Sequence, residues 1–404
     1  MLDRDGRRGF WTSFAGFSLD AMDVQLYAFV LPVLLPLWGL THAEGGLLAT
    51  VTLVSSALGG WAGGLLADRL GRIPVLKATI LCLALSTCLC GLAQDFQQLL
   101  VARALQGIGF GGEWAAGAVF VAELAAPESR ARMVGAVQSA WAIGWGMAAA
   151  SSAILLALLP PDWGWRATFL VGVIPALLIF FYRTRVPESA AFAPEHLRQP
   201  WHRIFARPLL ADTLRGSLLA IGMHGGYWAI ATWWPTMLHS ERGFSTFAVS
   251  AHLAVVVVGS LFGYAVAGWL SDHVGRRATL AGFALGGAVI VLACTRLPLS
   301  DAALLVLSFP LGFFALGMFS AIGPVLSELY PTELRGSGLG FCYNFGRGMA
   351  GATPLLVGNS VATMGIAHAL GLFATAAYGL ALLAILLLPE TRGQALTALA
   401  DTGG

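Results

Sequence analysis

Two nine-residue stretches, GLLADRLGR at 64–72 and GWLSDHVGR at 268–276, are copies of one pattern. Asp68 and Asp272 occupy the same place in the two copies and lie 204 residues apart. An offset of about half the chain length of 404 residues indicates that the chain is built from two similar halves.

A second pair of stretches repeats at nearly the same offset. ELAAPESR at 123–130 matches ELYPTELR at 328–335, which pairs Glu123 with Glu328 and Arg130 with Arg335. Because two separate loops recur together, the halves are expected to be parallel repeats, with a ligand site near the membrane midplane between them.

The composition describes a membrane protein. Hydrophobic residues make up 57% of the chain and charged residues 11%, with a net charge of +2. Charged residues are about 25% of an ordinary soluble domain, so this chain has too few to cover a soluble surface. Soluble enzymes, disordered chains and nucleic-acid binders are therefore excluded.

Hydropathy predicts an all-α membrane protein with twelve transmembrane helices in two six-helix halves. A helix needs roughly 20 apolar residues to cross the hydrocarbon layer, whereas a barrel strand needs only about 10. The expected spans lie near 11–37, 45–67, 74–93, 96–124, 133–159, 166–183, 213–238, 247–270, 278–296, 301–328, 337–360 and 364–388.

One long polar stretch divides these spans into six and six. The expected units are residues 1–183, a cytoplasmic linker over 184–212 and residues 213–404. Within the linker, WHRIFAR at 201–207 is typical of a short amphipathic helix on the membrane surface.

The distribution of positive charge sets the orientation. With a cytoplasmic N-terminus, the loops and tails on that side, counted with Arg183, hold 18 of the 23 Lys and Arg residues, and the other side holds three. This positive-inside pattern places both termini in the cytoplasm of a multi-pass protein of the inner (cytoplasmic) membrane.

The repeated loop resembles the signature of the major facilitator superfamily, and the resemblance covers nearly the whole chain. RALQGIG at 103–109 is similar to the arginine-glycine motif of that family, and PES at 187–189 and PETR at 389–392 close the two halves as in many members. The resemblance implies the major facilitator fold and a gating role for the loop residues Gly64, Asp68, Arg69, Gly71, Arg72, Asp272, Gly275, Arg276 and Arg277, with Glu123, Arg130, Glu328 and Arg335 in the second loop pair. Physically, an Asp can sit at a helix N-terminus while the arginines bridge to a neighbouring helix or to lipid phosphate.

Ionisable residues deep in the spans are the candidates for chemistry, because each is costly there. Asp20 and Asp23 share one face of the first helix, roughly 15 Å into the bilayer, with Tyr27 one turn further. A carboxyl group in such a site can take up and release a proton. Arg103 and Glu113 join them as proton-coupling candidates, and the alternative for these two is a buried structural pair.

The seventh and eleventh spans supply the candidate substrate site. At the repeat offset, His224 and Tyr227 correspond to Asp20 and Asp23, and Trp228 is adjacent. The alternative for His224 is a satisfied core residue. Asn344, Arg347 and the neighbouring Tyr343 lie in the eleventh span; we interpret the Arg347 guanidinium as a clamp for a substrate carboxylate, and pairing with Asp20 or Asp23 is the alternative.

A narrower resemblance indicates the substrate class. LDAMDVQLYAF at 19–29, GFGGEW at 109–114, GWRATFLVGVIP at 164–175 and YNFGR at 343–347 look like the sialate-type and aromatic-acid-type proton symporters. The resemblance implies uptake of a small organic anion with protons by a carrier that functions as a monomer. The alternatives are a proton antiporter that exports drugs or metabolites, a channel and a membrane-embedded enzyme. The fifth span lacks the glycine-proline motif of antiporters, which weakens the first of these.

Other motifs indicate no enzyme activity, cofactor, metal or nucleic-acid partner. G-x-G-x-x-G at 107–112 lies inside a span rather than after a strand, so its glycines predict close helix packing, as do the G-x-x-x-G pairs at 59–63 and 259–263. The five cysteines lie in apolar stretches without metal-binding spacing.

Overall fold

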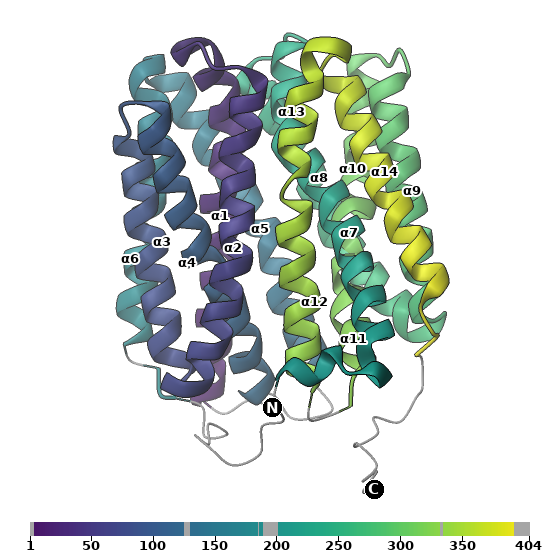
Figure 1. Ribbon diagram of the computed structural model, residues 1–404. Coiled ribbons are helices and arrows are strands. Elements are labelled where there is room, and N and C mark those ends of the chain that lie inside the picture. Colours follow the sequence, from purple (N-terminus) through teal and green to yellow (C-terminus); the bar gives the residue numbers. More distant parts are fainter. Residues whose placement is uncertain (1–3, 125–129, 185, 189–200, 332–333, 392–404) are drawn as a thin grey trace, which may run out of the picture.

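The structure is a computed structural model that describes residues 4–124, 130–184, 186–188, 201–331 and 334–391 (Figure 1). The first half consists of α1 (Arg4–Trp38), α2 (His42–Leu70), α3 (Arg72–Leu92), α4 (Phe96–Leu124), α5 (Arg130–Leu158) and α6 (Pro161–Arg183). A short 3-10 helix η1 (Trp201–Phe205) precedes α7 (Arg207–Ser240), α8 (Thr246–His273), α9 (Arg276–Arg296), α10 (Asp301–Gly317), α11 (Phe319–Glu328), α12 (Arg335–Ala350), α13 (Thr353–Met364) and α14 (Ile366–Leu387).

Two of the spans are interrupted. Met318 alone separates α10 from α11, and its backbone angles remain helical (φ −59°, ψ −23°). Pro354 lies in the first turn of α13, where its missing N–H breaks the ladder of helical hydrogen bonds that would otherwise continue from α12. Counting each interrupted pair as one helix gives twelve spans within the described residues, as the hydropathy predicts.

The polar stretch between the halves differs from the expectation. Residues 201–205 form a single 3-10 turn rather than an amphipathic α-helix, and α7 begins at Arg207, before the expected start at 213. Ile204 is fully buried, and the ring of Phe205 contacts that of Phe341 in α12. The turn therefore packs against the second half of the bundle.

The two halves stand side by side, with the start of α1 and the end of α14 at the same end of the bundle (Figure 1). We call this the terminal end and the opposite one the distal end. The helices that join the halves are α1 with α7, α2 with α12 and α13, and α5 with α8 and α11. Any site between these helices therefore lies on the interface between the halves.

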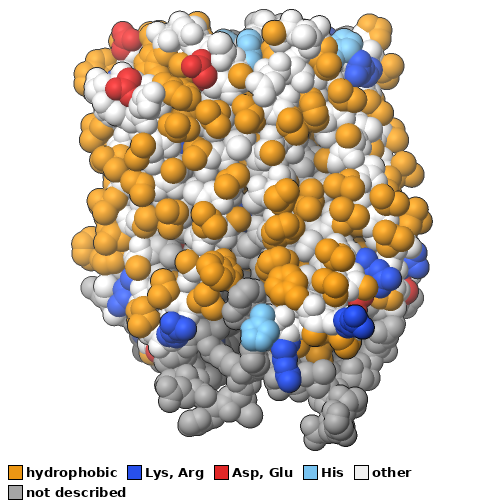
Figure 2. All heavy atoms as spheres, in the orientation of Figure 1, with side chains coloured by type: hydrophobic (Ala, Val, Ile, Leu, Met, Phe, Trp, Pro, Cys, Tyr) orange, Lys and Arg blue, Asp and Glu red, His pale blue; other side chains and the backbone are white. Residues whose placement is uncertain are grey.

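The outer surface is apolar around the middle of the bundle, and Lys and Arg side chains gather toward the terminal end (Figure 2). Nine helical segments of the described chain are long and apolar enough to cross a membrane. The spans that do not meet this measure are α4, α7 and α12–α13. Residues 222–238 of α7 are all buried, so this part of α7 faces protein rather than lipid and can carry glycines and polar groups.

Glycines bring neighbouring helices into direct backbone contact, as the motifs predict. A Cβ built on Gly111 of α4 would lie 1.8 Å from the Ser56 carbonyl oxygen of α2. In the other half, a Cβ on Gly259 of α8 would lie 2.1 Å from the Phe309 carbonyl oxygen of α10. The glycine-rich run in α4 is therefore a packing motif and no nucleotide-binding loop.

The halves are in close contact at the distal end. A Cβ on Gly46 of α2 would lie 2.4 Å from the Pro354 carbonyl oxygen of α13, and the Ser250 hydroxyl of α8 donates to the Ala149 carbonyl of α5 at 3.2 Å. Toward the terminal end, a Cβ on Gly336 or Gly340 of α12 would meet no described atom within 4 Å. The interior is thus closed toward the distal end.

Candidate functional site

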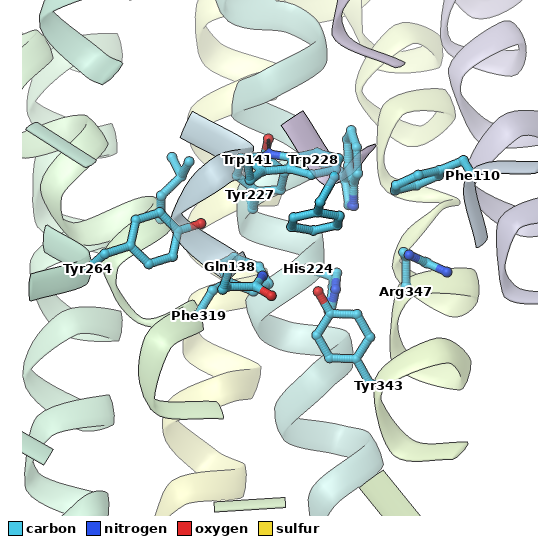
Figure 3. Close-up of a pocket in the computed structure, with 12 residues that line it drawn as sticks. Phe110, Gln138, Trp141, His224, Tyr227, Trp228, Tyr264, Phe319, Tyr343 and Arg347 are labelled. Carbon is cyan, nitrogen blue, oxygen red and sulfur yellow. Dashed lines mark hydrogen bonds between the residues drawn. The ribbon is translucent and has the colours of Figure 1, made fainter. Parts of the chain in front are cut away.

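A cavity lies between the halves, and the empty space within its outline is about 360 Å³, which includes space open to solvent. Its walls are mostly aromatic and come from both halves (Figure 3). The lining residues are Phe17, Phe110, Gln138 and Trp141 from the first half, and His224, Tyr227, Trp228, Tyr264, Leu316, Phe319, Tyr343 and Arg347 from the second. We call it the central cavity.

Arg347 of α12 lies at the edge of the central cavity and is 2% exposed. Its Nη2 donates to the Ser56 carbonyl of α2 at 3.0 Å and to Asn344 Oδ1 at 2.7 Å, and the guanidinium lies 4.7 Å from the ring centre of Phe110. Among the described residues it has no ion-pair partner, and its Nε has no hydrogen-bond partner. The alternative ion pair with Asp20 or Asp23 is thus not formed here.

The two acids of α1 differ in their surroundings. Asp20 is completely buried, and neither of its carboxylate oxygens has a hydrogen-bond partner in the described chain. Asp23 is also completely buried, and its Oδ2 accepts a hydrogen bond from Thr87 of α3 at 3.2 Å. A Cβ on Gly172 of α6 would lie 2.2 Å from Asp23 Oδ1, so α6 packs directly against this carboxylate. Asp20 is the less satisfied of the two.

His224, Tyr227 and Trp228 of α7 all line the central cavity (Figure 3). The His224 Nδ1 lies 2.9 Å from the Ala220 carbonyl oxygen, and its ring lies edge-on to Tyr343 at 4.7 Å. The Tyr227 hydroxyl accepts hydrogen bonds from Gln25 of α1 at 2.8 Å and from Trp141 of α5 at 2.5 Å. Tyr227 therefore ties the second half to two helices of the first.

Two expected substrate residues lie away from the cavity wall. The Oδ1 of Asn344 accepts a hydrogen bond from Arg347, and its amide N–H donates to the Gly340 carbonyl at 2.9 Å. Asn344 therefore positions the guanidinium. Tyr27 donates to the Gly45 carbonyl of α2 at 2.7 Å, and the Arg103 guanidinium lies 4.4 Å from the centre of the Tyr27 ring. Tyr27 therefore does not line the central cavity, and its role in substrate binding stays a prediction.

The alternative of a buried pair between Arg103 and Glu113 is wrong, because Glu113 pairs with Arg183 of α6. Arg183 Nη1 donates to Glu113 Oε2 at 2.8 Å, its Nη2 contacts Oε1, and Thr79 of α3 donates to the same carboxylate at 3.0 Å. Both side chains are almost completely buried. Arg183 was counted with the cytoplasmic loops because it ends its span, but its long side chain reaches back into the bundle.

The repeated loops have a shared geometry at the terminal end. Gly71 and Gly275 adopt positive φ angles of 100° and 128°, which favour glycine. A Cβ on Gly71 would meet Glu188, and one on Gly275 would meet Glu390. Each glycine therefore gives a glutamate from the end of the same half close access to a helix N-terminus.

These glutamates occupy the helix N-termini, and in the second half Asp272 does not. Glu188 accepts from the Ile73 N–H of α3 at 3.0 Å, and Glu390 accepts from the Arg276 and Arg277 N–H groups of α9 at 3.0 and 3.1 Å. Such contacts compensate the helix dipole. The expectation that Asp272 would sit there is wrong.

Arg276 connects the two repeated motifs of the second half. It forms ion pairs with Asp272 at 2.6 Å and with Glu328 at 3.0 Å. Arg335 donates from its Nε to the Ser327 carbonyl at 3.0 Å. In the first half, Arg72 donates to the Ala67 carbonyl at 2.6 Å and Arg69 is exposed. The side chains of Asp68, Glu123 and Arg130 lie outside the described residues.

Sequence reasoning missed most of the aromatic wall. Phe17 lies one turn before Asp20, and Gln138 and Trp141 are three residues apart on α5. The polar Gln138 in an otherwise apolar span was the signal that could have shown which face of α5 lines the cavity. Phe110, Tyr264 and Phe319 gave none, because aromatic residues also lie on exposed positions of the bundle, such as Phe181 and Phe262.

The fold and the inter-half cavity define a membrane transporter, and the comparisons agree. The family model described as Major Facilitator Superfamily matches residues 13–353 and 217–401. The chain belongs to this family. It is 41% identical over 398 residues to the "Probable 4-methylmuconolactone transporter" of Cupriavidus pinatubonensis, covering 96% of this chain and 92% of that protein.

Two further comparisons agree. The "Cis,cis-muconate transport protein" of Acinetobacter baylyi is 29% identical over 360 residues, covering 86% of each chain. The crystal structure of a D-xylose-proton symporter superposes with a TM-score of 0.75 at 21% identity, covering 96% of this chain and 99% of that one. These relatives are named as transporters, in agreement with the expectation of a carrier rather than an enzyme.

Proposed function

We propose that this protein is a proton-coupled symporter that takes up a small organic carboxylate across the cytoplasmic membrane. Residues 1–183 and 213–404 would rock about the central cavity as two units joined by the 184–212 linker, with both termini in the cytoplasm. The carrier would work as a monomer, since the cavity is built from one chain.

The Arg347 guanidinium carries this proposal. It is buried at the interface between the halves, has spare hydrogen-bond donors and has no acidic partner among the described residues. An unpaired buried cation is costly, and a carboxylate offsets that cost with charge-assisted bonds in a planar geometry. The surrounding aromatic rings favour an unsaturated or cyclic body on the same ligand.

Asp20 supplies the proton coupling in this scheme. An ionised carboxylate without hydrogen bonds is costly in a buried site, so Asp20 is suited to take up a proton when the substrate binds. Asp20 interacts electrostatically with Arg347 and also with Glu113, Arg183 and Asp23. A substrate carboxylate on Arg347 weakens the positive field at Asp20 and so favours its protonated form. Anion and proton then bind with positive linkage.

The names of the relatives support an organic acid as the substrate. Both 4-methylmuconolactone and cis,cis-muconate are unsaturated organic acids, and the proteins named for them match over most of this chain. The xylose symporter supports the fold alone at its level of identity.

Transport by purified protein in liposomes tests the proposal. With an acidic outside, the wild type should accumulate labelled 4-methylmuconolactone or cis,cis-muconate above its external concentration, and a protonophore should abolish this. Asp20→Asn should exchange the acid across the membrane without accumulating it. Accumulation that survives the protonophore, or an Asp20→Asn variant that accumulates as the wild type does, would refute the coupling.

The rival function is a proton antiporter that exports amphipathic compounds, and the aromatic cavity wall is the observation in its favour. Counterflow separates the two. An internal load of the acid should drive uptake of labelled acid in a symporter at zero pH gradient. An exporter should instead accumulate the compound in inside-out vesicles whose lumen is acid, because protons leave the lumen as the compound enters.

A further inference from the structure

A second cavity lies between the halves, beyond the central one. The empty space within its outline is about 240 Å³ and includes space open to solvent, and its lining comes from α1, α2 and α4 of the first half and from α7 of the second. Its polar lining includes Arg103, Gln25, Thr232 and Tyr27. We call it the outer cavity.

Arg103 is the charged group of the outer cavity and is 2% exposed. Its Nη1 donates to Gln106 at 2.5 Å, its Nε donates to the Leu48 carbonyl at 3.4 Å, and it lies over the Tyr27 ring. No Asp or Glu in the described chain forms an ion pair with it, and its Nη2 has no hydrogen bond there. Arg103 is therefore a buried cation without an anion, as Arg347 is.

The two arginines lie at different depths along the bundle axis. Arg103 is about 10 Å from the start of α4 at the distal end, at 1.5 Å per helical residue. Arg347 is about 25 Å from the end of α13, which also lies at the distal end. An anion that enters from the distal end would thus meet Arg103 first.

A thin wall separates the cavities. Trp228 lines both of them, and its indole Nε1 has no partner among the described residues. Beside it, the Gln25 amide donates to the Tyr227 hydroxyl across the interface between the halves. Opening of the distal end would separate Gln25 from Tyr227 and join the two spaces.

We propose that the outer cavity is a second carboxylate subsite, in which Arg103 binds the substrate anion before it passes Trp228 to reach Arg347. This inference rests on the proposed function, because it takes the same ligand. It assigns Arg103 to anion binding, where the sequence suggested proton coupling. The subsite would serve the distal face, because Arg103 lies nearer the distal end than Arg347 does.

Transport from each face separately tests the subsite. Right-side-out and inside-out membrane vesicles would be given labelled 4-methylmuconolactone, with cis,cis-muconate as the second probe. Arg103→Gln should raise the half-saturating concentration from the distal face by about 10-fold or more, the usual worth of a charged hydrogen bond. The value from the terminal face, and the calorimetric affinity of the purified protein, should stay unchanged. Arg103→Lys should show a smaller rise, since an ammonium keeps the charge without the planar fork.

Arg166→Gln is the matched control. Arg166 belongs to the distal end of the same half, but it bonds to the Gly91 and Ala93 carbonyls and lines neither cavity. Its loss should leave the half-saturating concentration unchanged from both faces. This control separates a local subsite from a general effect of removing a positive charge.

Three results would overturn the subsite. If Arg103→Gln leaves the half-saturating concentration from the distal face unchanged, no substrate anion binds at Arg103. If the half-saturating concentration rises equally from both faces, or if the purified variant loses its calorimetric affinity for the acid, Arg103 only supports the packing of the central cavity. A wild type that neither binds nor transports either acid refutes the proposed function itself, and the subsite with it.

Discussion

The buried pair of Glu113 and Arg183 should contribute to the stability of the first half rather than to proton coupling. Its two side chains are 3% and 1% exposed and form two parallel contacts, with Thr79 as a third partner. A Cβ on Gly16 of α1 would lie 2.7 Å from Glu113, so there is no room for water to replace a lost partner.

Removing one partner leaves the other charge buried and unpaired. Glu113→Gln and Arg183→Met should each lower the free energy of unfolding by about 3–5 kcal/mol. The double variant should lose less than the sum, because no uncompensated charge remains. Unfolding in mixed SDS and detergent micelles would measure all three, with wild-type protein as the reference.

The same variants separate stability from coupling. Folded Glu113→Gln protein should still accumulate substrate in response to a pH gradient. The buried-pair argument would be refuted if each single variant had a free energy of unfolding within about 1 kcal/mol of wild type. It would also be refuted if the loss in the double variant equalled the sum of the two single losses. Loss of accumulation in fully folded Glu113→Gln would return this acid to the proton path.

Three other predictions follow from the contacts described. Arg347→Ala should weaken calorimetric binding of the acid by a few hundred-fold or more, whereas Asn344→Ala should weaken it less because Asn344 only orients the guanidinium; equal losses would contradict this. Glu390→Gln should cost about 0.5–2 kcal/mol at the N-terminus of α9 and shift cysteine labelling between the two faces; unchanged labelling would remove the gating role. Gly111→Val should abolish monodisperse protein on size exclusion because its side chain would overlap α2, whereas Gly379→Ala, which has open space, should not; a well-folded Gly111→Val would show that the helices can separate.

The architecture was predictable because it follows from local patterns. Apolar runs of span length, the repeat at 64–72 and 268–276, and the asymmetry of Lys and Arg each depend on residues near one another in the chain. The interruption at Pro354 was also visible in the sequence, but whether a membrane helix continues through a proline depends on its neighbours.

The pairing of charges was not predictable, because it depends on which helix faces which. Glu113 and Arg103 are on the same helix, yet Glu113 pairs with Arg183, which is 70 residues further along the chain. The repeat geometry did bring His224 and Tyr227 to the interface opposite α1. It could not show that Tyr227 bonds to Gln25 rather than to the acids themselves.

Calorimetry with proton counting tests the central claim most directly. Binding of 4-methylmuconolactone or cis,cis-muconate to purified protein would be measured in two buffers of different ionisation enthalpy at the same pH. The account predicts a net uptake of protons on binding in the wild type, and no such uptake in Asp20→Asn, which should still bind the acid through Arg347. Binding heats that do not depend on the buffer in the wild type, or an Asp20→Asn variant with undiminished proton uptake, would contradict it.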